Sequence, residues 1–201
     1  MRTLALIGIF SVMVALLTGC GGGLVGETGY EVAFKPAQAN LDSGWEDFDA
    51  GSYASAYDKF MAVLNQEHSR DQEIEANLGA GWAKLKLDGF DAARSYFEAA
   101  STEAAAKIAL AADALVRADK DDIEYWLGEL ERLGYGNPNA TLSLKHNFGI
   151  TNARLHALMA LLYYYAGDTA SASAHAQAAG ILNNPEAESQ AIDDIADWLG
   201  G

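Results

Sequence analysis

The sequence has little cysteine, little proline and few basic residues. A single cysteine among 201 residues excludes a small fold held together by disulfides. Lys and Arg number 13 against 28 Asp and Glu, a net charge of −15, so the dense basic surface that binds nucleic acid is missing. The hydrophobic share of 50% is ordinary for a folded protein and excludes a disordered polar chain. We therefore expect one ordered domain with no nucleic-acid partner.

The only cysteine, Cys20, ends an N-terminal segment with the pattern of an export signal. Arg2 gives the segment a basic start, and an almost unbroken apolar run covers residues 4–17. This run is shorter than the roughly 20 apolar residues of a membrane span and has the size of a signal-peptide core. We therefore expect residues 1–19 to be a signal peptide that is removed.

Residues 17–20, Leu-Thr-Gly-Cys, resemble the lipobox of bacterial lipoproteins, in which the cysteine is acylated and becomes the new N-terminus. The resemblance implies that Cys20 carries fatty acids such as palmitate and anchors the protein in a membrane of the bacterial cell envelope. Gly21 stands where the family often has an Asp for inner-membrane retention, which favours the outer membrane if the host has one. A plain secretory signal with a chance cysteine, or a short anchor helix, is the alternative. Residues 20–36 begin with glycines and are predicted to form a flexible tether.

The scarcity of proline, together with many Ala and apolar residues three and four apart, predicts helices in the rest of the chain. No sustained alternation typical of strands is evident. An internal repeat with a shift of 37 is present, since Gly44-Trp45 recurs as Gly81-Trp82. Five more pairs match at this shift: Phe48/Leu85, Tyr53/Phe90, Ala56/Ala93, Phe60/Phe97 and Ala62/Ala99. Each unit predicts two helices, over 42–49 and 53–64 and over 74–87 and 90–100.

The two units resemble the tetratricopeptide repeat family at their small-residue positions, at the turn between the helices and at the Ala and Phe positions of the second helix. A similar pattern lies at 153–182, and a fainter helix pair covers 103–117 and 121–133. Residues 134–150 contain Gly and Pro and are predicted to be a long loop. A final amphipathic helix over 186–199 is predicted to cap the repeats. The resemblance implies an all-α fold, a short right-handed α-solenoid of TPR-like helix hairpins, over residues 37–201.

No motif indicates catalysis or metal binding. None of the four histidines has metal-ligand spacing, although His156 and His175 lie on predicted facing helices, where they either meet or sit as ordinary interhelical or surface residues. The Gly-x-Ser-x-Gly motif is absent, and the single thiol is the predicted lipidation site. Carboxylates are plentiful, but a catalytic pair does not differ in sequence from an acidic surface. We therefore predict no catalytic residue, metal or cofactor, with a hydrolase as a rival hypothesis.

In tetratricopeptide repeats the first helix of each pair lines a groove that binds an extended peptide or a partner helix. The resemblance places the following residues on this groove: Trp45, Trp82, Lys86, Arg154 and Tyr165. Periodic aromatic residues are also typical of packing, so Trp45 and Trp82 are equally well interpreted as core residues.

The sequence as a whole predicts a non-enzymatic, lipid-anchored envelope protein with a TPR-like groove for an envelope protein or peptide. The resemblance suggests an accessory in the assembly of a pilus, secretion or outer-membrane complex. One alternative is an adaptor for peptidoglycan enzymes. Another is a glycan-binding or small-ligand-binding lipoprotein that uses the residues 163–165, all Tyr, and the loop at 134–150.

Overall fold

The computed structural model describes the backbone of residues 28–181 and the side chains of residues 35–181. The predicted signal peptide, Cys20 and the predicted cap at 186–199 lie outside the described residues. The chain divides into two compact units, residues 1–35 and 36–201, and the side-chain contacts and the site described below belong to the second unit. None of the described helices combines the length and the hydropathy that spanning a bilayer requires.

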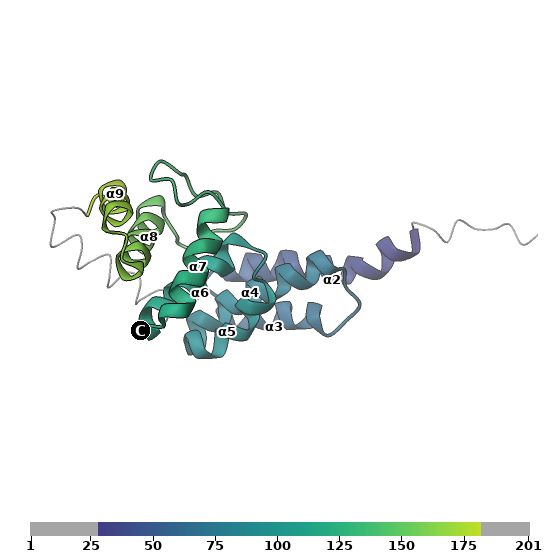
Figure 1. The fold of residues 1–201 in the computed structure, drawn as a ribbon. Coiled ribbons are helices and arrows are strands. Elements are labelled where there is room, and N and C mark those ends of the chain that lie inside the picture. Colours follow the sequence, from purple (N-terminus) through teal and green to yellow (C-terminus); the bar gives the residue numbers. More distant parts are fainter. Residues whose placement is uncertain (1–27, 182–201) are drawn as a thin grey trace, which may run out of the picture. The chain divides into compact units, whose positions relative to one another are not determined.

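The predicted all-α class is confirmed, because the described residues form eight helices and no strand (Figure 1). Consecutive helices pack against one another, including α3 with α4, α4 with α5, α6 with α7 and α8 with α9. This arrangement is consistent with an all-α helical repeat. The helices are α2 (Thr28–Asp49), α3 (Tyr53–Leu64), α4 (Arg70–Asp88), α5 (Phe90–Ala99), α6 (Ala104–Arg117), α7 (Lys120–Arg132), α8 (Asn152–Ala166) and α9 (Thr169–Ala179).

Two helices begin earlier than the sequence pattern predicted. Helix α4 begins at Arg70 rather than at residue 74, because Ser69 and Gln72 form a reciprocal capping box at its N-terminus. Helix α2 begins at Thr28 rather than at residue 42, and it contains Pro36. The last residues of the predicted tether, 28–36, are therefore helical.

The repeat of 37 residues is also a repeat of contacts. Phe60 of α3 packs on Gly44 of α2, where an added Cβ would lie 2.8 Å from the ring. One unit further on, the ring of Phe97 would lie 2.9 Å from a Cβ on Gly81. The ring of Phe60 also fills the space over Gly79 of α4, so the same side chain holds three helices together. Glycine is needed at these positions because the ring occupies the volume of a side chain.

The segment between α7 and α8 contains no helix, as predicted, but it is not an ordinary polar loop. Its residues 140–150, which we call the strap, have no regular hydrogen-bonded structure. Even-numbered strap residues are buried or half-buried and odd-numbered ones are exposed, over eleven consecutive positions. This is the side-chain alternation of an extended chain with one face against the protein. The sequence interpretation missed this alternation.

Candidate functional site

The part of the strap that contains His146 and Phe148 lies on a face formed by α2 and α4, which we call the groove. Trp45 and Phe48 of α2 and Trp82 of α4 contribute its aromatic rings, and all three are buried. Trp45 and Trp82 are 37 residues apart, and each makes an edge contact with the phenylalanine of its own unit, Phe60 and Phe97. The helical repeat therefore places two tryptophans in equivalent positions.

Two rings of the strap cover these tryptophans. The His146 imidazole stacks on Trp45 with a centroid distance of 3.6 Å and an interplanar angle of 12°. The Phe148 ring stacks on Trp82 at 4.8 Å and 25° and touches Phe48 edge-on. Such pairs contribute about 0.5–1.5 kcal/mol each beyond the burial of their area. The two strap residues are two positions apart, so both point to the groove.

Glu75 of α4 is the polar centre of the groove. One of its oxygens, Oε1, lies 2.7 Å from Lys145 Nζ, 3.1 Å from His146 Nε2 and 3.1 Å from Trp45 Nε1. The hydrogen bond from His146, opposed by burial and assisted by Lys145, lowers the pKa of Glu75 from 4.5 to about 2. The carboxylate therefore stays ionised and binds donors from both the groove and the strap.

A cleft of about 280 Å³ lies beside the strap, between the N-terminal parts of α4 and α6. Three acidic residues, Asp71, Glu75 and Glu103, line it together with one basic residue, Lys145. Its apolar lining includes Leu78 and Leu144. The cleft thus combines hydrophobic contact with negative charge, which favours a positively charged ligand group.

The structure separates the five residues that the sequence placed on the groove. Trp45 and Trp82 belong to the core, with 6% and 1% of their surface exposed, so the packing interpretation describes them, and the strap covers them. Arg154 is half-buried at the end of the strap, where its Nη1 donates to the carbonyl of Gly149 at 2.6 Å. Lys86 is exposed in the last turn of α4. Tyr165 is 53% exposed on α8, and within residues 35–181 its recorded ring contact is with Tyr164.

His156 and His175, for which the sequence left a meeting or an ordinary interhelical or surface place open, are buried between helices and in contact. Their Nδ1 atoms are 3.0 Å apart, and their Nε2 atoms face the carbonyl oxygens of Ala140 (3.0 Å) and Gly136 (3.2 Å). Burial lowers the pKa of His175, which favours the neutral form of that ring. The pair fixes the start of the strap to α8 and α9.

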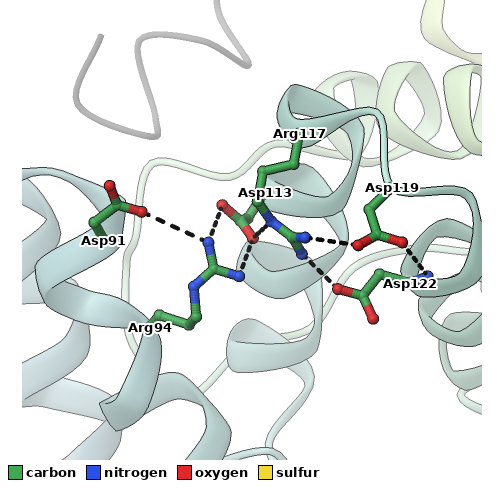
Figure 2. Close-up of polar contacts among 6 residues, drawn as sticks. All are labelled: Asp91, Arg94, Asp113, Arg117, Asp119 and Asp122. Carbon is green, nitrogen blue, oxygen red and sulfur yellow. Dashed lines mark hydrogen bonds and ion pairs between the residues drawn. The ribbon is translucent and has the colours of Figure 1, made fainter.

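A second polar cluster joins α5, α6 and α7 (Figure 2). Asp113 is 4% exposed and lies between Arg94 Nη1 at 2.8 Å and Arg117 Nε at 2.7 Å. Arg117 also pairs with Asp119 and Asp122, and these carboxylates raise its pKa. Each of the four carboxylates in Figure 2 has at least one oxygen paired with an arginine, while the second oxygen of Asp119 accepts from the backbone N–H of Asp122. The shared arginines join the three helices, so the cluster acts as packing between helices.

Sequence reasoning missed Glu75, His146 and Phe148. The alternation of apolar and polar residues in the strap was a usable signal for the last two, whereas nothing in the sequence linked Glu75 to Lys145, 70 positions away. Within residues 35–181, no group of three or more His, Cys, Asp or Glu is placed to hold a metal ion. Comparisons with protein-family models, curated proteins and solved structures found no match.

Proposed function

We propose that this protein is a lipid-anchored envelope protein that works as a TPR-like interaction scaffold and not as an enzyme. Its groove on α2 and α4 would hold an extended segment of an envelope protein or peptide. The supporting observation is the strap itself, a segment of eleven residues with alternate side chains turned inward, of which His146 and Phe148 lie on this face. The groove therefore has the properties needed for recognition of an extended chain.

Recognition of this kind combines pockets for alternate side chains with a few fixed polar groups. In this groove two tryptophan faces supply the first requirement and the carboxylate of Glu75 supplies the second. Tryptophan is a frequent binding hot spot because its large ring, when buried by a partner, excludes water from the contact. The acidic cleft next to Lys145 adds room for part of a partner that the strap does not fill.

The anchor and the location belong to the same proposal. The resemblance of residues 17–20 to a lipobox supports attachment through Cys20, and Gly21 favours the outer membrane. An anchor of two or three acyl chains holds a protein stably at a membrane, where the local concentration of the scaffold rises. A lipid anchor combined with an interaction scaffold fits a role in the assembly of a pilus, secretion or outer-membrane complex.

Site-specific photo-crosslinking tests the scaffold function. A photoreactive amino acid replaces Asp71 or Glu103 at the edge of the cleft in the full-length protein, which is then produced in its own host. A third variant carries the same group at Tyr125, which is exposed on α7 and does not line the cleft.

We expect both cleft positions to give an adduct with the same envelope protein, identified by mass spectrometry, and Tyr125 to give none. Equal adducts from all three positions, or no adduct from the cleft, would contradict the proposal. The anchor has a separate test. Mass spectrometry of the purified protein should find acyl groups on Cys20, and C20S should leave the membrane fraction.

A further inference from the structure

The strap is covalently part of the chain, yet it lies in the groove as a separate ligand would. From this we infer that the strap is an internal competitor, and that the partner segment reproduces its chemistry. That segment is extended, has a basic residue followed by two ring side chains two positions apart, and replaces Lys145, His146 and Phe148 on the groove. This inference rests on the proposed function and specifies the partner and the regulation of that site.

The contacts define what the partner segment needs. A ring at the position of His146 covers the face of Trp45, and a second ring at the position of Phe148 covers Trp82. A cation at the position of Lys145 pairs with Glu75, whose carboxylate also accepts a hydrogen bond from Trp45 Nε1. The intervening residue, Asn147, is exposed, and its Oδ1 accepts from the backbone N–H of Gly149, so its side chain contacts the strap itself.

Electrostatics favours the same partner. Asp71, Glu75 and Glu103 give the cleft three negative charges against the single positive charge of Lys145. A partner with one or two further basic residues before the ring pair would fill the cleft with matching charge, which the strap leaves uncompensated. The whole chain is strongly acidic, with a net charge of −15, and this also attracts a basic segment.

Polar contacts outside the aromatic cluster hold the strap at both ends. The backbone N–H of Leu142 donates to Asn152 Oδ1 at 2.6 Å, and Arg154 donates to the carbonyl of Gly149. A segment tethered so closely has an effective concentration in the millimolar range. A free segment with the same contacts therefore binds the intact protein only weakly, until the strap is loosened.

The test uses a fluorescent peptide with the sequence of residues 141–150, TLSLKHNFGI, and full-length protein. Its binding is measured by fluorescence anisotropy at low salt and pH 7. The main variant, K145A/H146A, removes two donors to Glu75 and the ring on Trp45 but keeps Phe148 in the core. The control, T141A, changes an exposed strap residue that does not line the cleft.

We expect the peptide to bind K145A/H146A at least tenfold more tightly than the wild type or the control. A peptide with its Lys and His replaced by Ala should lose this binding, and adding E75Q to the variant should weaken it by tenfold or more. Circular dichroism checks that each variant is folded.

N152A keeps the inference testable if the main variant fails to fold, because it removes only the contact with Leu142 at the exposed start of α8. It should bind the peptide several-fold more tightly than the wild type. Equal affinities in all proteins, or no binding to any variant, would overturn the inference. A dimer of exchanged straps in gel filtration would overturn it too, since the competitor is then a second copy. Crosslinks at Asp71 and Glu103 without peptide binding would leave the scaffold function in place and remove only this inference.

Discussion

Replacing Trp82 by Ala should lower the free energy of unfolding by about 3–5 kcal/mol, the usual cost of emptying a core aromatic site. Only 1% of the Trp82 surface is exposed, and its ring contacts both Phe97 of its own unit and Phe148 of the strap. The substitution therefore removes packing inside a repeat and the surface on which the strap rests. Val116, which is 62% exposed on α6, provides the control, since V116A should change stability by no more than about 0.5 kcal/mol.

Trp82→Phe separates the packing of the ring from its polar atom. The Nε1 of Trp82 is buried, and no acceptor lies within hydrogen-bond distance of it among the described residues. An unpaired buried donor costs about 1–3 kcal/mol, so its removal offsets the loss of ring volume. The free energy of unfolding of W82F should therefore lie within about 1 kcal/mol of that of the wild type, although W82A changes the same position.

Urea unfolding followed by far-ultraviolet circular dichroism measures both effects. The dependence on urea concentration should keep the same slope, so that shifts of the midpoint report stability. If W82A cost less than about 1 kcal/mol, Trp82 would not be a core residue. If W82F were as unstable as W82A, the unpaired Nε1 of Trp82 would carry no energetic cost in the wild type.

Three further results are expected. G79A should cost about 1–3 kcal/mol in urea unfolding because its Cβ would overlap the ring of Phe60. G128A lies in a helix with open space around it and should stabilise the protein by about 0.5–1 kcal/mol. Equal effects of the two substitutions would contradict the packing of Phe60 on Gly79. D113A should cost about 1.5–3 kcal/mol because it removes the buried carboxylate that both arginines share and leaves them only more exposed partners, whereas the exposed D121A should cost less than about 0.5 kcal/mol. Near-equal losses of the two variants in thermal unfolding would refute the cluster's role. The pKa of Glu75 is lowered from 4.5 to about 2, so its contribution of up to about 3 kcal/mol to stability is present above pH 4.5 and is lost as the pH falls toward 2. E75Q should therefore flatten the pH dependence of stability in this range, and an unchanged slope in E75Q would exclude Glu75 as its cause.

The helix hairpins were predictable from sequence because each depends on local patterns. The match of Gly44, Phe60, Gly81 and Phe97 at a shift of 37 already implied the ring-on-glycine packing that both units show. The start of α4 was placed four residues late, since the signal lay in a capping Ser69 and not in the apolar period. Cap residues determine where a helix begins, while apolar spacing determines only which face is buried.

The groove was harder to predict because its parts come from distant positions. Gly and Pro in the segment at 134–150 indicated a loop, and this concealed the two-residue alternation that places His146 and Phe148 on one face. The sequence also left Trp45 and Trp82 open between groove and core. The structure places both rings in the core, each with a phenylalanine of its own unit on one side and a ring of the strap on the other.

The order of the chain gives the strap a consequence during biosynthesis. Both tryptophans lie before residue 83, while the rings that cover them arrive at His146 and Phe148. At translation rates of about 5–20 residues per second, the two events are separated by a delay on the order of ten seconds. Until those rings are made, the two indole faces lack their cover, and we expect the first two hairpins to be a site of chaperone binding.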